Sequence, residues 1–228
     1  MRLPDYWLER PDEAIDDSTR LAFDDLLETT LVSGGNPIIQ YTLPAPKWQF
    51  LCHLADHHAL ALHGSGNAQI ASFEPRQSND LNHFGNQKAM YAAADGIWAM
   101  FFAISDRDGY EMTVTNACIR QVDRDGMTSG PFYFFSVSKQ ALARRPWRTG
   151  TVYLLPRATF ETQPPLPFSA SEVHIAQLAS RVSVQPLARL TVDPSDFPFL
   201  SEIRGHDDRL LQETATALQT GGPLPEAD

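Results

Sequence analysis

The sequence predicts an α+β fold, in which N-terminal helices precede a run of short strands that one further helix interrupts. Three observations carry this prediction. The chain has 228 residues, 43% hydrophobic and 20% charged, which is typical of one globular domain with its own core. Apolar residues recur at helical spacing before residue 58, and short β-type runs separated by turns follow it. Helices and strands do not alternate, which argues against a parallel βαβ sheet.

Two helices are predicted near the N-terminus. Residues 18–29 place Leu21, Leu26 and Leu27 on one face, with Ser18 as the expected N-cap. Residues 46–57 have an apolar stripe and start with a proline, a residue favoured in the first helical turn. These helices form an N-terminal helical extension, residues 1–58.

The β-rich part follows at residues 59–200, and residues 201–228 are expected to form an acidic C-terminal tail. A short apolar helix over 97–104 is expected to be capped by Asp95. The stretches 74–87 and 162–170 are rich in polar residues and turn formers, which predicts loops. Strands are expected at 59–62, 89–92, 112–120, 132–137 and 151–155, with a last β-type stretch over 182–192.

Charge and cysteine content narrow the function classes. There are 18 Lys and Arg against 28 Asp and Glu, a formal charge of −10, which disfavours general nucleic-acid binding. The acids concentrate at the two ends, whereas residues 76–157 carry seven acids and ten bases. Cys52 and Cys118 have no metal-ligand spacing, and we find neither a secretory signal nor an apolar run long enough to span a membrane. A cytoplasmic protein that handles a small molecule is the simplest interpretation.

Three short motifs carry possible chemistry. His63-Gly64-Ser65 ends a predicted strand, where the imidazole and hydroxyl can bond ribose hydroxyls or an amide, and glycine admits close approach to the backbone. Tyr91 lies among small residues and offers a flat ring for stacking. Glu172 follows a polar loop at the start of a strand. Taken singly, each has a more common structural interpretation: a strand-to-turn junction, a half-buried strand tyrosine and a solvent-facing glutamate.

Two other clusters favour structural roles. His53 and His57 are four residues apart and His58 follows, yet the glutamate of an H-E-x-x-H motif is missing, so we expect no metal site. The segment from Arg144 to Arg148 groups three arginines around Trp147, which suits a phosphate but is more often a solvated turn.

In their order along the chain, the three motifs resemble the ADP-ribosyltransferase superfamily, in its branch with a His–Tyr–Glu triad. The resemblance rests on His-Gly-Ser at 63–65, Met-Tyr-Ala at 90–92 and Glu-Val-His-Ile at 172–175, and covers about residues 59–195. It implies a split β-sandwich that clamps NAD in a cleft. It also implies transfer of ADP-ribose from NAD, with loss of nicotinamide, to an acceptor that the sequence does not identify, or to water as in an NAD glycohydrolase.

Roles for individual residues follow from the same resemblance. His63 and Glu172 match the residues that bind the nicotinamide ribose, Gly64 the backbone contact to the carboxamide, and Tyr91 the ring that stacks on nicotinamide. Ser65 belongs to the same motif. From its position in the polar loop, Arg76 could contact the pyrophosphate, for which a guanidinium is well shaped.

Departures from the family pattern leave alternatives open. The tripeptide Tyr-Ala-Thr is Tyr-Ala-Ala here, and Ala170 replaces the second acid of families that modify arginine. Glu161 also follows a strand and competes with Glu172 for the carboxylate role. Two other functions compete with the enzyme: a catalytically silent nucleotide-binding module on this fold, and an interaction protein. An exposed apolar surface on Trp98, Phe101 and Phe102 would favour the latter.

Overall fold

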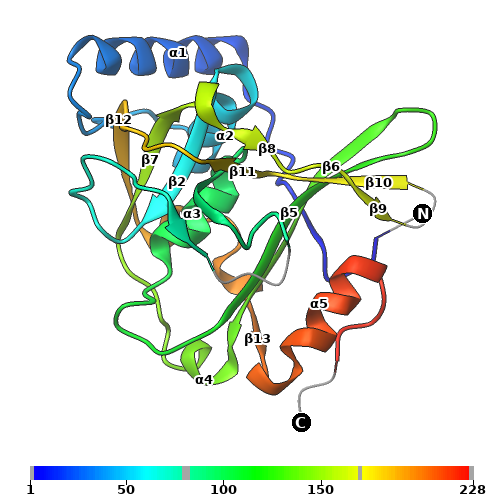
Figure 1. The fold of residues 1–228 in the computed structure, drawn as a ribbon. Helices are drawn as coiled ribbons and strands as arrows, with labels where there is room; N and C mark the ends of the chain where they lie inside the picture. Colours follow the sequence, from blue (N-terminus) through cyan, green and yellow to red (C-terminus); the bar gives the residue numbers. More distant parts are fainter. Residues whose placement is uncertain (1–2, 79–82, 169–170, 226–228) are drawn as a thin grey trace.

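The computed structural model describes residues 3–78, 83–168 and 171–225, and these residues form two largely antiparallel sheets with helices against them. This confirms the α+β class (Figure 1). Sheet A has the order β1-β6-β5-β10-β9, with β13 also pairing with β6. Sheet B has the order β12-β7-β2-β4-β11-β8, with β3 pairing with β4.

The helices are α1 (Asp17–Val32), α2 (Lys47–His57), α3 (Gly96–Ile104), α4 (Lys139–Leu142) and α5 (Leu211–Thr220). The strands of sheet A are β1 (Leu8–Glu9), β5 (Val114–Val122), β6 (Thr128–Ser138), β9 (Leu166–Phe168), β10 (Ser171–Ile175) and β13 (Arg204–His206). Those of sheet B are β2 (Leu60–Ser65), β3 (Arg76–Gln77), β4 (Lys88–Ala93), β7 (Gly150–Pro156), β8 (Glu161–Thr162), β11 (Gln177–Ser180) and β12 (Ala188–Val192).

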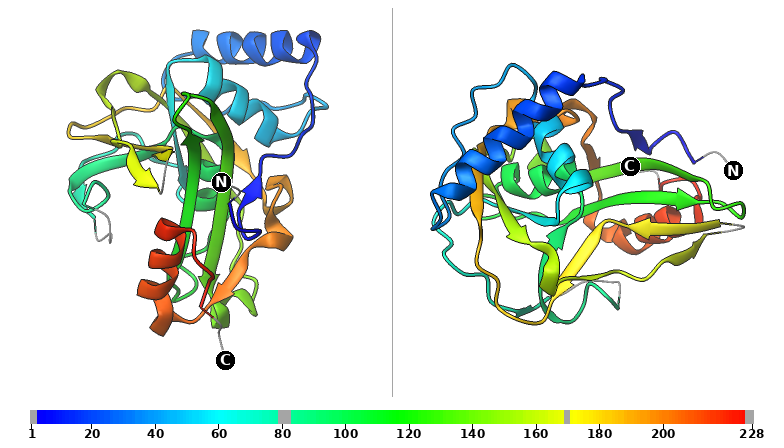
Figure 2. Two further views of the ribbon diagram at one scale, coloured as in Figure 1. Left: turned by 90° about the vertical axis from the view of Figure 1, so that its right-hand side faces the viewer. Right: turned by 90° about the horizontal axis from the view of Figure 1, so that it is seen from above.

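The two sheets meet at Ala176, between β10 and β11. Its N–H donates to the carbonyl of Cys118 in sheet A, and its own carbonyl accepts from the N–H of Ala94 beside sheet B. A nearly continuous extended segment therefore belongs first to sheet A and then to sheet B. The β5–β6 pair runs out from this corner, away from α1 and α2 (Figure 2).

The N-terminal helices form where the sequence predicts them, with two corrections. The N-cap of α1 is Asp16, whose carboxylate accepts from the N–H of Thr19, rather than Ser18. The buried face of α1 is Phe23 and Leu27, whereas Leu21 is 64% exposed. The expected face is therefore right at Leu27 and wrong at Leu21, whose place in the core is taken by Phe23.

The short apolar helix is confirmed as α3, and Asp95 caps it by accepting from the N–H of Trp98. Asp95 is 1% exposed and also accepts from Arg10 at 2.7 Å and from the Tyr133 hydroxyl at 2.9 Å. Because an unpaired buried carboxylate is costly, this ion pair fixes the N-terminal segment to the start of α3.

The apolar core is largest around α2 and α3, which pack between residues of both sheets. Trp98 and Phe101 belong to it, with exposures of 6% and 0%, so α3 does not present the apolar surface that an interaction protein would need there. Smaller clusters lie around Phe73 and Tyr153 on sheet B and around Tyr6 and Phe134 on sheet A.

The segment 201–228 is expected to form an acidic tail, but its described residues, 201–225, include a strand of sheet A. Strand β13 pairs in parallel with Ser136–Ser138 of β6, and α5 follows it. The Tyr6 hydroxyl donates to the carbonyl of Ala217, so the N-terminal segment around Tyr6 contacts α5. In the described part of the chain, no helix is both long and apolar enough to cross a membrane.

Candidate functional site

Sheet B opens between β2 and β4, where two of the sequence motifs lie. Strand β2 pairs with β7 along all of Leu60–Ser65. Among the described residues it pairs with β4 only at Leu62 and Ala93. From His63 onward the two strands therefore separate, and we call this opening the β2–β4 split.

His63 bridges the β2–β4 split. Its Nδ1 lies 2.8 Å from the carbonyl oxygen of Tyr91, and since a carbonyl only accepts, Nδ1 carries the proton. Burial lowers the pKa of His63 to about 4, with Arg107 adding a smaller repulsive effect. The imidazole is therefore neutral near pH 7, and its Nε2 is an acceptor that no described residue hydrogen-bonds.

Tyr91 and His63 meet through the Tyr91 backbone, while their side chains lie on opposite faces of sheet B. His63 is opposite Tyr153 and packs with its ring 4.7 Å from that of Phe73. Met90 belongs to the same apolar cluster as Phe73, and alternation along a strand then turns Tyr91 to the other face. The Tyr91 hydroxyl donates to the Phe84 carbonyl at 2.9 Å, which fixes the ring.

Packing alone accounts for the residues that follow His63. A Cβ atom at Gly64 would lie 1.9 Å from the Ala99 carbonyl oxygen, so close contact with α3 requires glycine. Ser65 Oγ accepts from the N–H of Asn67 at 3.1 Å and shapes the turn. The glycine expected to admit a ligand thus has a structural reason for its presence.

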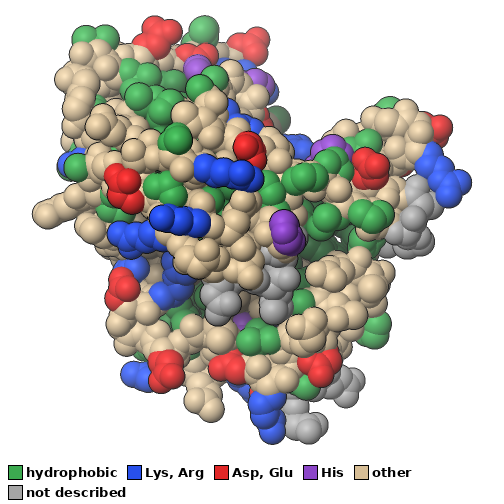
Figure 3. All heavy atoms as spheres, viewed as in Figure 1, with side chains coloured by type: hydrophobic (Ala, Val, Ile, Leu, Met, Phe, Trp, Pro, Cys, Tyr) green, Lys and Arg blue, Asp and Glu red, His purple; other side chains and the backbone are tan. Residues whose placement is uncertain are grey.

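Basic side chains border this region. Arg76 is exposed on β3 and lies opposite Ala89 of β4. Figure 3 shows Lys and Arg side chains gathered over β8, β11 and α3, although the chain as a whole is acidic. In the arginine cluster near Trp147, Arg148 pairs with Asp106 at 3.1 Å and Asp108 at 2.6 Å, which favours the structural interpretation for that arginine.

The two competing glutamates lie at different distances from Tyr91. Glu172 is on β10 in sheet A, with a side chain 64% exposed. It precedes Ala179, the partner of Tyr91, by seven residues, about 23 Å of extended chain. Glu161 on β8 pairs with Ala179 directly, so it lies two strands, about 10 Å, from Tyr91 on the same face. The structure therefore brings Glu161, and not Glu172, into a row with Tyr91.

Ala170, which replaces the second acid of the family pattern two residues before Glu172, lies outside the described residues, as do parts of the loops 74–87 and 162–170.

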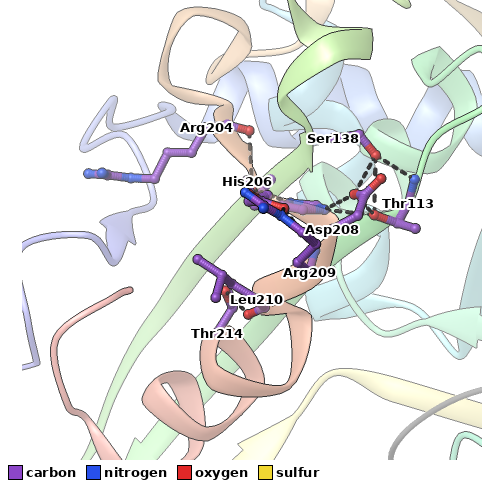
Figure 4. A network of polar contacts seen from close by, with 10 residues as sticks. Thr113, Ser138, Arg204, His206, Asp208, Arg209, Leu210 and Thr214 are labelled. Carbon is purple, nitrogen blue, oxygen red and sulfur yellow. Dashed lines mark hydrogen bonds and ion pairs between the residues drawn. The ribbon is translucent and has the colours of Figure 1, made fainter. Parts of the chain in front are cut away.

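A second polar cluster surrounds His206 on β13 (Figure 4). The spacing of its residues along the sequence does not predict it. His206 Nδ1 lies 2.7 Å from Ser136 Oγ, and Nε2 lies 2.7 Å from Thr113 Oγ1 and 3.3 Å from Asp208. Burial lowers the pKa of His206. A cavity of about 160 Å³ borders Ser136 and His206.

These residue types match a serine hydrolase, but Ser136 is only 1% exposed. Thr113 Oγ1 donates to Asp208 at 2.6 Å, so His206 Nε2 donates to Thr113 Oγ1, and in the neutral ring Nδ1 accepts from Ser136 Oγ at 2.7 Å. Ser136 Oγ also lies 3.1 Å from the Arg204 carbonyl on β13. A nucleophilic serine must be open to a substrate carbonyl, and this hydroxyl is buried between β6 and β13. The cluster therefore holds β13 against β6.

Comparison of the chain with protein-family models, with curated proteins and with solved structures gives no match.

Proposed function

We propose that the chain binds NAD at the β2–β4 split and cleaves its nicotinamide–ribose bond, passing ADP-ribose to an acceptor or to water. The observation that carries this proposal is the split itself. The pairing of β2 with β4 ends at Leu62, and His63 hydrogen-bonds to the Tyr91 backbone there, so the His-Gly-Ser and Met-Tyr-Ala motifs lie at one place in sheet B, which supports a shared ligand site. NAD is the substrate in this proposal, and the reaction requires no metal.

The neutral His63 supplies the binding group. With Nδ1 donating to the Tyr91 carbonyl, Nε2 accepts a hydrogen bond from a ribose hydroxyl of NAD. The basic side chains near β3, Arg76 among them, supply positive charge for the pyrophosphate. Tyr91 contributes through its backbone carbonyl, which orients His63, because its ring lies on the other face of sheet B.

A carboxylate is needed because loss of nicotinamide leaves positive charge on the ribose, and a nearby anion stabilises that charge in the transition state. We propose Glu161 for this role over Glu172, because Glu161 lies in sheet B two strands from Tyr91 whereas Glu172 lies in sheet A. The register starts the Glu161 side chain on the face of the Tyr91 ring, opposite that of His63. This revises the assignment that the sequence motif alone supports.

The test is nicotinamide release from NAD by the purified chain, with Glu161→Gln and Glu172→Gln as matched variants. We expect wild type to release nicotinamide, Glu161→Gln to lose activity about 100-fold or more, and Glu172→Gln to stay within about threefold of wild type. His63→Gln should weaken NAD binding by about tenfold, because it removes one hydrogen bond to a polar group. Loss of activity in Glu172→Gln alone would contradict the Glu161 assignment.

A specific observation favours a second function, a silent nucleotide-binding module on the same fold. The residue opposite Tyr91 is Ala179, and the side chains of Glu161 and Glu172 are each 64% exposed, so neither is held in a water-excluded site. For such a module we expect NAD to raise the melting temperature of the wild-type chain, His63→Gln to abolish this rise, and no nicotinamide to be released. Absence of both binding and release would contradict both functions.

A further inference from the structure

We propose that Asp24, His53 and His58 form a binding site for a divalent transition-metal ion of the zinc class. The site lies between α1 and the C-terminal end of α2, and it is independent of the β2–β4 split. The Nε2 atoms of His53 and His58 lie 2.7 and 2.8 Å from the same oxygen, Oδ1 of Asp24. The three donor atoms all lie within 4.8 Å of one another.

The donor set selects the class of ion. Two imidazole nitrogens and one carboxylate oxygen suit Zn²⁺ and its neighbours, whereas Ca²⁺ and Mg²⁺ prefer oxygen alone. Bonds of about 2.0–2.1 Å to zinc place tetrahedral donors about 3.3 Å apart. Asp24 Oδ1 must therefore withdraw from each imidazole by about 0.5 Å. The donor atoms lie up to 4.8 Å apart, so the two imidazole nitrogens must also approach each other, a change that rotation of the part-exposed His58 side chain can supply.

The burial of His53 sets this cluster apart from an ordinary surface ion pair. Its side chain is 4% exposed, and its ring packs against Phe23 and His57 with centroid distances of 5.5 and 4.8 Å. These contacts hold Nε2 toward Asp24, so one ligand nitrogen is already fixed in position. When Nε2 binds an ion, the ring proton is carried by Nδ1.

The surroundings allow an ion to enter and remain bound. The side chains of Asp24 and His58 are 38% and 29% exposed, which leaves a path from solvent and a fourth tetrahedral position for water. Because Asp24 belongs to α1 and His53 to α2, the ion would join the two helices.

Sequence spacing conceals this site. His53 and His57 have the spacing of a helical metal pair, yet the cluster contains His58 instead, and Asp24 comes 29 residues before His53. His57 is exposed, with its ring centroid 4.8 Å from that of His53. It therefore provides a matched control, a neighbouring histidine outside the proposed donor set.

The experiment measures zinc binding by the untagged full chain after removal of metal by a chelator. Zn²⁺ is titrated in competition with a chromophoric chelator, and Co²⁺ is titrated alone to record its absorption spectrum. We expect one ion per chain, and weaker binding by about tenfold or more in Asp24→Asn and His58→Gln. His57→Gln should bind as wild type does, and Co²⁺ in wild type should give the intense bands of a tetrahedral site.

Two controls keep the outcome decisive. Circular dichroism of the metal-free variants tests whether each remains folded. If His58→Gln does not remain folded, the test rests on the zinc affinity of the isosteric Asp24→Asn. Zinc should raise the melting temperature of wild type and His57→Gln but not of Asp24→Asn. The proposal is overturned if wild type binds no stoichiometric ion, if folded Asp24→Asn retains wild-type affinity, or if His57→Gln weakens binding as much as His58→Gln.

Discussion

At the residue scale, His63 shows how one hydrogen bond and burial determine the tautomer and the protonation state of an imidazole. Its Nδ1 proton is committed to the Tyr91 carbonyl, and burial keeps the ring neutral with a pKa of about 4. The unfolded chain, by contrast, takes up a proton near the ordinary pKa of 6.5. Acid therefore favours the unfolded chain, because only there can the imidazole charge freely.

We predict that His63 contributes to acid sensitivity between pH 6.5 and pH 4. Above pH 6.5 the residue is neutral in both states and has no effect on the pH dependence. As the pH falls from 6.5 toward 4, wild type should lose up to about 3 kcal/mol of unfolding free energy that His63→Gln does not lose. Urea unfolding at several pH values measures this difference. Parallel pH profiles for the two proteins would contradict it, and His206→Gln separates the contribution of the second buried histidine.

Residue roles that depend on local sequence could be predicted, and roles that depend on pairing could not. Asp95 directly precedes an apolar run, so its capping of α3 follows from the sequence. The row that joins Tyr91 to Glu161 depends on strand register across β11, which no local pattern around Glu161 reveals. For the same reason, no local pattern reveals that Asp24 contacts two histidines that lie 29 and 34 residues away.

At the element scale, the contact between β2 and α3 depends on a single missing side chain. Gly64 faces α3 so closely that an added Cβ would lie 1.9 Å from the Ala99 carbonyl oxygen and 2.6 Å from the Ala103 nitrogen. Both of these are backbone atoms of the helix, which cannot rotate away. The packing of α3 onto sheet B therefore tolerates nothing larger than glycine here.

We predict that Gly64→Ala lowers the unfolding free energy by about 3 kcal/mol, because α3 must shift away from β2. Gly222→Ala is the matched control. Its added Cβ would meet only the Thr220 hydroxyl at 3.3 Å, and we expect a change within about 0.5 kcal/mol. Chemical denaturation of both variants provides the comparison. Equal stability of Gly64→Ala and wild type would show that α3 is not held as closely as described.

Most elements could be located from periodicity and turn residues, but their sheet partners could not. The strands expected at 89–92, 132–137 and 151–155 are present as β4, β6 and β7, each extended by a few residues. The segment 171–180 has one continuous β-type pattern, yet it supplies β10 to sheet A and β11 to sheet B. Strand pairing depends on contacts between residues far apart in the sequence. Strand β13 has three residues, too few for a recognisable pattern, and it is a strand because it pairs with β6.

At the scale of the whole molecule, the two ends of the chain protect one strand edge. Strand β6 pairs with β5 on one side, while β1 contacts Phe132 and Tyr133 and β13 contacts residues 136–138. An unpaired central strand would expose a row of backbone donors and acceptors. The acidic ends of the sequence are thus part of the folded domain rather than appendages to it.

We predict that a chain truncated after Glu202 does not fold cooperatively. The truncation removes β13, α5 and the His206 hydrogen bonds, and it exposes the apolar cluster around Tyr6 and Phe134. The combined loss should exceed about 5 kcal/mol, comparable to the stability of a typical domain. Near-ultraviolet circular dichroism and thermal unfolding measure the effect. Arg209→Ala, at a side chain 82% exposed, should unfold as wild type does, and a cooperative transition in the truncated chain would contradict the prediction.

The corner at Ala176 constrains how a molecule as large as a dinucleotide can reach the β2–β4 split. Because one extended segment is shared by both sheets and is bonded on one side to Cys118 and on the other to Ala94, neither sheet can swing without breaking those bonds. The element that adjoins the proposed NAD site is the loop that carries Asn67, Ile70 and Phe73, which two hydrogen bonds and one ring contact hold to Tyr153. In the proposed reaction, NAD would enter between β2 and β4 only when these contacts break, and their lifetime would then limit turnover.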